Sequence, residues 1–538
     1  MPTKTLSGSF AHVAPPIAIV RPTSSPLPAA SAVPAATPVP RAPRVAVLVA
    51  HGMGQQVRFE TLEAVAQVLR TGQSLCVKDV PPGAGKPPPR PEVIARQVQY
   101  AGEFLARVEM RLENGQGREA DVHVYEAYWA PLTEGLITAR ETFLFLLNAA
   151  WTGVRSARHG GFKRHLFGDW QTWKLGHRPM IGFALAALVL ASLGLMNAVV
   201  ASVATVRAVT GNSVRWPSGE LLAILTRDFT WFLAWLFVPL LAGVAVSRLG
   251  RKRREAGGFD TPPRALSVVG MALVYVGVGA TVFFGGVVAW HLVQHGMQTD
   301  ATAGSSIQAP SLRHMLAVWL PVVVLTGVVS AFLRQYVGDV AIYVSSHKVS
   351  RFAATRRAIQ DACTRVARCI YEAREADGRT ALYDRIVVVG HSLGSVVAYD
   401  TLNAILREDE ATGRPLQADQ RTAALITFGS PLDKTAYVFR SQQPGEHDIR
   451  EALSSAYQPL VSDYRYRPRR WLNLHSWLDW ISGSLDYYDT APGAQGSARR
   501  VENVCDLQAT TPVIAHTEYW VGSTLARELW KEVMGSAG

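Results

Sequence analysis

The sequence predicts an α/β protein in which a mostly parallel sheet, flanked by helices, is interrupted by a four-helix transmembrane insertion. Two observations lead to this fold class. Short apolar runs alternate with helical segments towards both ends of the 538-residue chain, and such alternation indicates a parallel sheet. Four long apolar stretches with almost no charge lie between these regions, and each is near the length that crosses a bilayer.

The composition agrees with a membrane protein. Apolar residues make up 48% of the chain and charged residues 18%, which is more apolar than an ordinary soluble domain. The formal net charge of +12 would suit nucleic acid, but the basic residues gather beside the apolar stretches, as in membrane proteins. The four cysteines are scattered, so we expect reduced thiols. No pair has C-x-x-C spacing and no Cys/His cluster suggests zinc, so we expect no metal site. We also expect no cofactor.

The N-terminal part begins with a stretch rich in Pro, Ala and Ser. Residues 1–43 cannot bury enough apolar surface to fold alone, so we expect a flexible tail, and no continuous apolar segment predicts a signal peptide. From Arg44 the run RVAVLVAHGMG predicts a buried strand and a tight turn. With further strands near 105–112 and 121–129, residues 44–150 form the first part of the α/β domain.

Residues 151–334 are the predicted insertion. Its four stretches approach or exceed the ~18–20 residues that cross a bilayer, and tryptophans in or beside them suit the membrane interface. The expected spans are 181–203, 229–247, 266–290 and 315–333. The stretch 141–151 is too short to span, and a core helix and a helix in the membrane interface are equal alternatives for it.

Basic residues predict the orientation of the spans. They are frequent before the first span, in the loop 248–265 and after the fourth span, and they are sparse in the other two loops. By the positive-inside rule, the basic segments are cytoplasmic. An even number of spans returns the chain to the same side, so residues 44–150 and 335–538 can fold together. We therefore expect a multi-pass protein of the bacterial inner membrane with this domain in the cytoplasm.

The second part of the α/β domain, 335–538, begins with an amphipathic helix. Apolar residues recur at helical spacing within 349–376 and would share one face. These residues are Ile359, Cys363, Val366 and Ile370. Further along, DRIVVVG, AALITFGSP and RRWLNLHS predict strands, and SVVAYDTLNAIL predicts a helix.

The segment Gly390-His391-Ser392-Leu393-Gly394 matches the G-x-S-x-G pattern of a nucleophile elbow. A buried strand precedes it and a helix follows it, as the elbow requires, because the serine sits on a strained strand-to-helix turn that exposes its hydroxyl. Gly390 and Gly394 suit positions where a side chain would collide with backbone. Ser392 is therefore the predicted nucleophile.

A serine hydroxyl needs a general base, and an acid must orient that base. Behind this elbow the chain order is serine, acid, histidine. His516 follows an apolar run near the C-terminus and is the predicted base. His475 precedes the predicted acid, which breaks the order, and His447 lies in a polar loop.

The predicted acid is Asp479, because it follows a late strand in a Trp-rich loop, HSWLDWIS. Asp433, directly after FGSP, is the main competitor, and Asp486 and Asp489 are further alternatives.

The negative charge that forms during acyl transfer needs two aimed N–H donors. One is expected from Leu393, directly after the nucleophile, and the other from the loop after an early strand. The loop His51-Gly52-Met53-Gly54 fits this description, and we nominate the N–H of Met53. The alternative is that this segment is only a tight turn.

These segments resemble the lipase-like α/β hydrolases, and more narrowly the DDHD-domain intracellular phospholipase A1 family. AHGMGQ, GDVAIYVSS, GHSLGSVVAYDTL, WLNLHSWLDWIS and AHTEYW are similar to that family's motifs, motif by motif, over residues 45–60 and 335–525. The resemblance implies an α/β-hydrolase fold, a triad of Ser392, Asp479 and His516, and hydrolysis of a phospholipid or related ester. The four spans depart from that family, and its acidic-histidine cluster is not recognisable, so no metal site is carried over.

The expected function is that of a membrane-embedded serine hydrolase, a lipase, esterase or phospholipase that works through an acyl-enzyme. Its expected partners are a lipid or other acyl-ester substrate and the bilayer, without nucleic acid. Two alternatives stay open: a thioesterase or protein deacylase with the same residues, and a non-catalytic membrane interaction or transport component. Acyl-chain length, head group and oligomeric state are not specified by the sequence.

Overall fold

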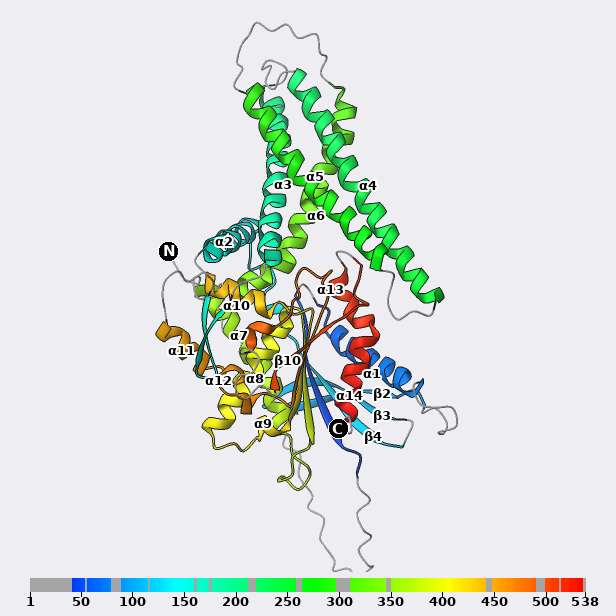
Figure 1. The fold of residues 1–538 in the computed structure, drawn as a ribbon, viewed down its shortest axis with the longest axis vertical. Coiled ribbons are helices and arrows are strands. Elements are labelled where there is room, and N and C mark those ends of the chain that lie inside the picture. The colour runs from blue at the N-terminus through cyan, green and yellow to red at the C-terminus, as the bar shows by residue number, and fades with distance from the viewer. Residues whose placement is uncertain are drawn as a thin grey trace, which may run out of the picture. The chain divides into compact units, whose positions relative to one another are not determined.

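The structure is a computed structural model of the whole chain, shown in Figure 1. It describes residues 41–53, 56–78, 89–114, 117–158, 162–173, 177–210, 219–257, 264–296, 310–344, 350–441, 448–489, 499–511 and 514–535. Nearly all of the predicted N-terminal tail lies outside the described residues.

An eight-stranded sheet forms the centre of the α/β domain, in the order β10-β9-β8-β7-β1-β4-β3-β2. All neighbouring pairs are parallel except those that β3 makes with β2 and β4. The strands are β1 (Arg44–Ala50), β2 (Val93–Tyr100), β3 (Glu103–Glu113), β4 (Glu119–Ala127), β7 (Arg385–His391), β8 (Thr422–Phe428), β9 (Arg470–His475) and β10 (Val501–Cys505). The mostly parallel sheet predicted from the sequence is thus confirmed.

Strands from both sides of the insertion share this sheet. β1 pairs with β4 on one side and with β7 on the other, so that Val45–Ala50 lie opposite 385–390. Because β1 and β7 are parallel, their carboxyl ends meet at one edge of the sheet. The loop after β1 and the turn after β7 are therefore neighbours.

Helices cover both faces of the sheet (Figure 1). α7 (Ser350–Glu372) and α8 (Leu393–Ala411) pack on one face, and α1 (Glu60–Lys78) and α14 (Ser523–Met534) pack on the other. β1 is buried on both sides, which explains its continuous apolar sequence. The four apolar residues predicted to share one face of α7 all lie in the core.

Four long helices occupy the predicted insertion. They are α3 (His177–Thr210), α4 (Gly219–Gly257), α5 (Arg264–Gly296) and α6 (Leu312–Val344). Each contains a segment long and apolar enough to cross a membrane, namely Ala184–Val206, Gly219–Gly250, Val268–Gln294 and Leu312–Ala331. Only 22–28% of the most apolar window of each segment is buried, so most of its apolar surface needs an apolar surrounding such as lipid.

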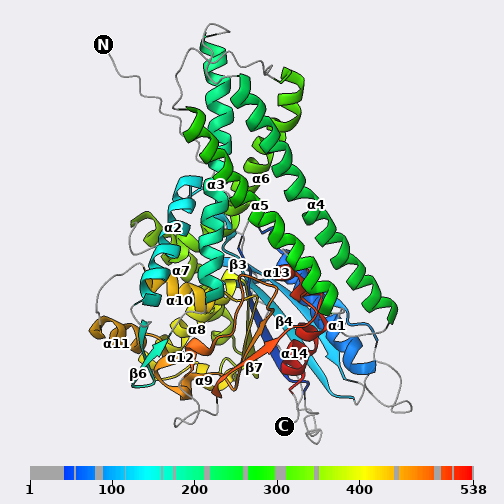
Figure 2. The same cartoon turned by 45° about the horizontal axis from the view of Figure 1, so that its top comes forward.

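α4 and α5 run side by side (Figure 2). A Cβ atom on Gly243 of α4 would lie 2.8 Å from the carbonyl oxygen of Gly270 on α5. This close backbone approach is typical of small residues between membrane helices.

The stretch 141–151 lies within α2 (Ala139–Arg158). Phe145, Leu146 and Ala149 of α2 pack against α3 and α6, while Leu147 is exposed. α2 is therefore a packing partner of the insertion helices rather than of the sheet. α2 and α6 also cross the predicted domain boundaries at 150 and 334.

A hairpin of β5 (Phe162–Leu166) and β6 (Asp169–Trp173) follows α2. It contacts the α/β domain, because the N–H of Phe167 donates to the carbonyl of Val461 at 3.0 Å. The sequence did not predict this hairpin, nor β2 and β10. β2 is polar and largely exposed, and β10 is only five residues long, so neither has the apolar pattern of a buried strand.

Candidate active site

Ser392 lies on the turn between β7 and α8, at the carboxyl edge of the sheet. Its φ of 53° and ψ of −130° are unusual for a residue with a side chain and store backbone strain. The N–H of Ser392 donates to the carbonyl of Phe428 at 3.0 Å, which anchors the turn to β8. The residue is only 1% exposed, so another molecule could reach its hydroxyl only when neighbouring groups move.

The two glycines of the motif are required by close packing. A Cβ atom on Gly394 would lie 2.2 Å from the carbonyl oxygen of Ala50 and 2.3 Å from that of His51. A Cβ atom on Gly390 would lie 2.5 Å from the Cα of Ser395. These contacts agree with the backbone collisions inferred from the sequence, and they bring the end of β1 against the start of α8.

A continuous chain of hydrogen bonds joins Ser392, His516 and Asp479. The Oγ of Ser392 lies 2.7 Å from the Nε2 of His516, and the Nδ1 of His516 lies 3.0 Å from the Oδ2 of Asp479. Since an ionised carboxylate only accepts, Nδ1 carries the imidazole proton and Nε2 is free to accept the serine proton. The three residues come from the β7–α8 turn, α13 (Ala515–Glu518) and the loop after β9.

Asp479 is held as a carboxylate. Burial opposes its ionisation, but His516 and hydrogen bonds outweigh this and keep the pKa of Asp479 well below its usual range. Its Oδ1 accepts the N–H of Ile481 at 2.9 Å, and its Oδ2 also accepts the hydroxyl of Tyr519 at 3.0 Å. The loop after β9 therefore presents a fixed, charged acceptor to the histidine.

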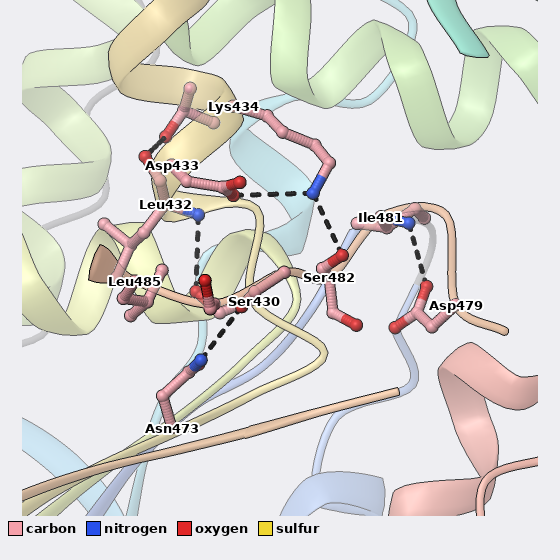
Figure 3. Close-up of polar contacts among 12 residues, drawn as sticks. Ser430, Leu432, Asp433, Lys434, Asn473, Asp479, Ile481, Ser482 and Leu485 are labelled. Atoms are coloured by element: carbon pink, nitrogen blue, oxygen red, sulfur yellow. Dashed lines mark hydrogen bonds and ion pairs between the residues drawn. The ribbon is translucent and has the colours of Figure 1, made fainter. Parts of the chain in front are cut away.

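Asp433, the competing acid, has a different partner (Figure 3). It lies near the start of α10 (Leu432–Ser441) beside Lys434, whose Nζ is 3.4 Å from Asp433 Oδ1 and 3.0 Å from the carbonyl oxygen of Ser482. Burial raises the pKa of Asp433. The structure thus brings Asp479, and not Asp433, to His516.

The remaining candidates are placed elsewhere. Asp486 accepts hydrogen bonds from Ser484 and Asn503. Asp489 forms a buried ion pair with Arg467 at 2.5 Å. His475 ends β9, where burial lowers its pKa, and His447 lies outside the described residues.

The loop nominated for the second N–H donor lies against the elbow. A Cβ atom on Gly52 would lie 3.0 Å from the Cβ of Ser392. In the described part of the chain, the N–H groups of Met53 and Leu393 make no hydrogen bond to the protein, so both remain available as donors. Gly54, the last residue of this motif, lies outside the described residues.

Two buried histidines support the site in roles that the sequence did not predict. The Nε2 of His51 accepts the N–H of Trp129 at 3.0 Å, and its Nδ1 donates to the carbonyl of Gly52 at 2.9 Å. His391 donates from Nε2 to the backbone carbonyl of His516 at 3.0 Å. Burial lowers the pKa of His51 to about 4 and that of His391 to about 3. Both rings are therefore neutral and hold neighbouring backbone in place through hydrogen bonds. In the sequence, only their places in the motifs His51-Gly52-Met53-Gly54 and Gly390-His391-Ser392-Leu393-Gly394 pointed to them.

These histidines predict a loss of stability in acid. The unfolded chain, with an ordinary histidine pKa of 6.5, binds protons below that pH, whereas folded His51 and His391 do not until pH 4 or lower. The free energy of unfolding should fall by about 1.4 kcal/mol per pH unit for each histidine as pH drops from 6.5 towards 4, with no effect above 6.5. Melting temperatures of the detergent-solubilised protein between pH 8 and 5 measure this dependence.

His391→Gln is the matched variant, because the amide keeps a donor and cannot titrate in this range. Its melting temperature should depend less on pH than that of the unchanged protein. An equally steep dependence in both proteins would contradict the assignment of His391.

One hollow among the described residues lies away from this site. It has a volume of about 650 Å³ and is lined by Arg44, Arg96 and Arg107, among others. Arg44 begins β1, whereas Ser392 lies at the edge where β1 ends. The hollow is therefore separated from Ser392 by the length of a strand.

The arrangement has a definite chemical capacity. A hydroxyl hydrogen-bonded to a neutral imidazole, which a carboxylate orients in turn, loses its proton as it attacks an electrophilic carbon.

The described residues contain no group of three or more His, Cys, Asp or Glu side chains that could hold a metal ion. The chain matches no protein-family model, no curated protein and no solved structure.

Proposed function

We propose that the protein is a membrane-embedded serine hydrolase of the α/β-hydrolase fold that cleaves an acyl ester. The observation that carries the proposal is the hydrogen-bonded chain from Ser392 through His516 to Asp479. The strained turn at Ser392, the order of the three residues along the chain and the parallel sheet behind them support the same reading. The five motifs that resemble the DDHD-domain phospholipases agree with it.

In the proposed reaction, Oγ of Ser392 attacks the ester carbonyl while His516 takes its proton. The carbonyl oxygen becomes negative and is stabilised by the N–H groups of Met53 and Leu393. Asp479, ionised because of its low pKa, stabilises the imidazolium. His516 then gives the proton to the leaving alcohol, and a water activated by the same imidazole releases the acid from Ser392.

A lipid ester is the substrate class that the surroundings favour. Trp477, Trp480, Ile514 and Val521 are exposed large apolar side chains in the segments that carry Asp479 and His516. Trp480, the neighbour of Asp479, also stacks on Tyr275 of α5 with ring centroids 5.1 Å apart. The candidate site is thus apolar at its rim and linked directly to a helix with a predicted span, which suits a substrate drawn from the bilayer.

Thioesters and acylated proteins would be cleaved by the same residues, but no observation favours them over a lipid. A non-catalytic membrane component would not need Ser392, His516 and Asp479 at hydrogen-bonding distance. From the positive-inside argument, we place the α/β domain and its site on the cytoplasmic side.

Fluorophosphonate probes test both the nucleophile and the side of the membrane. A permeant probe should label Ser392 in cells and in inverted membrane vesicles, because an activated serine displaces its fluoride. A charged, impermeant probe should label only the inverted vesicles. Mass spectrometry of the labelled peptide identifies the modified residue.

Each result has one meaning. Labelling by neither probe, or at a residue other than Ser392, would refute the proposed nucleophile. Labelling of intact cells by the impermeant probe would leave the nucleophile standing and reverse the proposed orientation.

A further inference from the structure

A second cavity of about 190 Å³ lies beside the elbow helix. Val396, Tyr399 and Asp400 of α8 line it, and they follow Ser392 by roughly 6 to 12 Å at 1.5 Å per residue. Leu432, shortly after β8, forms another wall. The cavity is smaller than the ~300 Å³ or more of pockets that enclose a whole drug-sized ligand, so it fits a single chemical group of a larger substrate.

Arg164 of β5 brings a buried positive charge to this cavity. It is only 5% exposed, and its guanidinium lies over the rings of Tyr487 and Tyr488, at 3.9 and 4.6 Å from their centroids. Of its five N–H donors, one makes a long hydrogen bond of 3.4 Å to the carbonyl of Tyr487. Within the described ranges it forms no ion pair with a carboxylate.

Arg467 shows how this protein otherwise buries a guanidinium. It is completely buried and bonds to Asp489 at 2.5 Å and to the carbonyl of Leu460 at 2.8 Å. A buried charge without such compensation is costly. Arg164 lacks this compensation and borders a cavity, so the structure has room for an anion where Arg467 has a carboxylate.

The other charged groups of the cavity do not supply that anion. Asp400 already accepts from Tyr343 at 2.7 Å, from Gln360 at 3.0 Å and from Arg356 at 3.1 Å. Glu451 borders the cavity from α11 (Asp448–Ala456) and forms no ion pair with Arg164.

The hydroxyl of Ser455, which also lies in α11, adds a second donor. The Oγ of Ser455 is buried and has no hydrogen-bond partner among the described residues, and Ser455 lines the cavity. A guanidinium and a hydroxyl together are donors that suit a phosphate.

We propose that this cavity binds the phosphate group of a phospholipid whose ester carbonyl lies at Ser392. The inference rests on the proposed function and names its substrate class. In a glycerophospholipid five or six bonds separate an ester carbonyl from the phosphorus, about 6–8 Å when extended with bonds near 1.5 Å. This length of about 6–8 Å falls within the roughly 6 to 12 Å that separate Ser392 from the residues of α8 that line the cavity. Arg164 itself belongs to the hairpin before α3, so the insertion would contribute directly to substrate choice.

Hydrolysis of two matched esters tests the proposal with the full-length protein in an uncharged detergent. The substrates are a short-chain phosphatidic acid and the diacylglycerol with the same acyl chains. Arg164→Gln should lower kcat/KM for phosphatidic acid by about 10- to 100-fold, the usual effect of losing hydrogen bonds to a charged group. It should change kcat/KM for diacylglycerol less than threefold.

Lys163→Gln is the control, because it removes the same charge from the neighbouring, exposed residue of β5. This variant should leave kcat/KM for both substrates unchanged. An equal loss on both esters in Arg164→Gln, or no loss on either, would overturn the proposal.

Binding to the Ser392→Ala protein separates this proposal from the proposed function. Lysophosphatidic acid should raise the melting temperature more than monoacylglycerol does, and Arg164→Gln should remove the difference. Equal shifts with the two lipids would overturn the phosphate site even if Arg164→Gln fails to fold. A saturable rise of the melting temperature with inorganic phosphate alone, which lysophosphatidic acid does not change, would assign the cavity to free phosphate. That result would overturn the proposal of a lipid ligand.

The two proposals can therefore fail separately. A protein that binds lysophosphatidic acid through Arg164 but hydrolyses neither ester retains the cavity and loses the hydrolase. A protein that hydrolyses both esters alike retains the hydrolase and loses the phosphate site.

Discussion

Ser392→Ala is expected to lower kcat for ester hydrolysis by about 10⁶-fold, the scale seen when a serine nucleophile is removed from an assembled site. The change deletes the atom that attacks the carbonyl and leaves His516 and Asp479 without a function. Release of fatty acid from a short-chain ester, followed under saturating substrate, measures kcat. The fold should remain, because Ser392 is anchored through its backbone N–H rather than its hydroxyl.

Ser395→Ala is the matched control on the same helix. Ser395 is equally buried, but its hydroxyl donates to the carbonyl of Gly390 at 2.8 Å and does not bond to His516. We expect this variant to lose some stability and less than tenfold in kcat. If Ser392→Ala retained activity near that of Ser395→Ala, the nucleophile would have to be sought elsewhere.

Asp479→Asn should lower kcat by about 10⁴-fold, as the same change does where an aspartate orients a histidine. Asparagine keeps the shape, and its oxygen at the Oδ1 position can still accept from Ile481, while its amide nitrogen takes the place of Oδ2 and cannot accept from Tyr519. However, its amide can donate to Nδ1 of His516, which favours the tautomer whose Nε2 carries a proton and cannot accept one from Ser392. kcat and the melting temperature together distinguish this effect from unfolding.

Asp433→Asn provides the comparison, because it is the same substitution at another buried aspartate of the site region. It removes the counter-charge of Lys434, so we expect a lower melting temperature and a kcat within tenfold of the unchanged protein. A larger loss of kcat at Asp433 than at Asp479 would show that the wrong aspartate has been assigned to His516.

The parts of the fold that were predictable are those with a local signal. β1 and β7 contain continuous apolar runs, at 45–50 and 386–389, because both faces of the sheet are covered. Ser392 was recognisable because an elbow needs glycines and a particular strand–turn–helix context. His516 and Asp479 followed from their order along the chain. Their assembly around Ser392 is consistent with that order, since Asp479 follows β9 and His516 follows β10 of the same sheet.

The parts that were not predictable depend on contacts between distant segments. The supporting roles of His51 and His391 depend on hydrogen bonds to distant segments, namely to the N–H of Trp129 and to the backbone carbonyl of His516. Arg164 looked like one of many basic residues before the first span, and only the hairpin's packing against Tyr487 buries it. No pattern in one short segment contains such information.

The place of β1 in the sheet also bears on how the chain is made. β1 lies between β4 and β7, and more than 250 residues separate the end of β4 from the start of β7. At roughly 5–20 residues per second, synthesis of that interval takes about 10–50 s. During this time α3–α6, which are long and apolar enough to cross a membrane, leave the ribosome. One edge of β1 meanwhile has no strand to pair with. Such an edge is prone to aggregate. In the proposed membrane protein, insertion of α3–α6 and protection of the nascent β1–β4 segment must therefore be coordinated before the sheet can close.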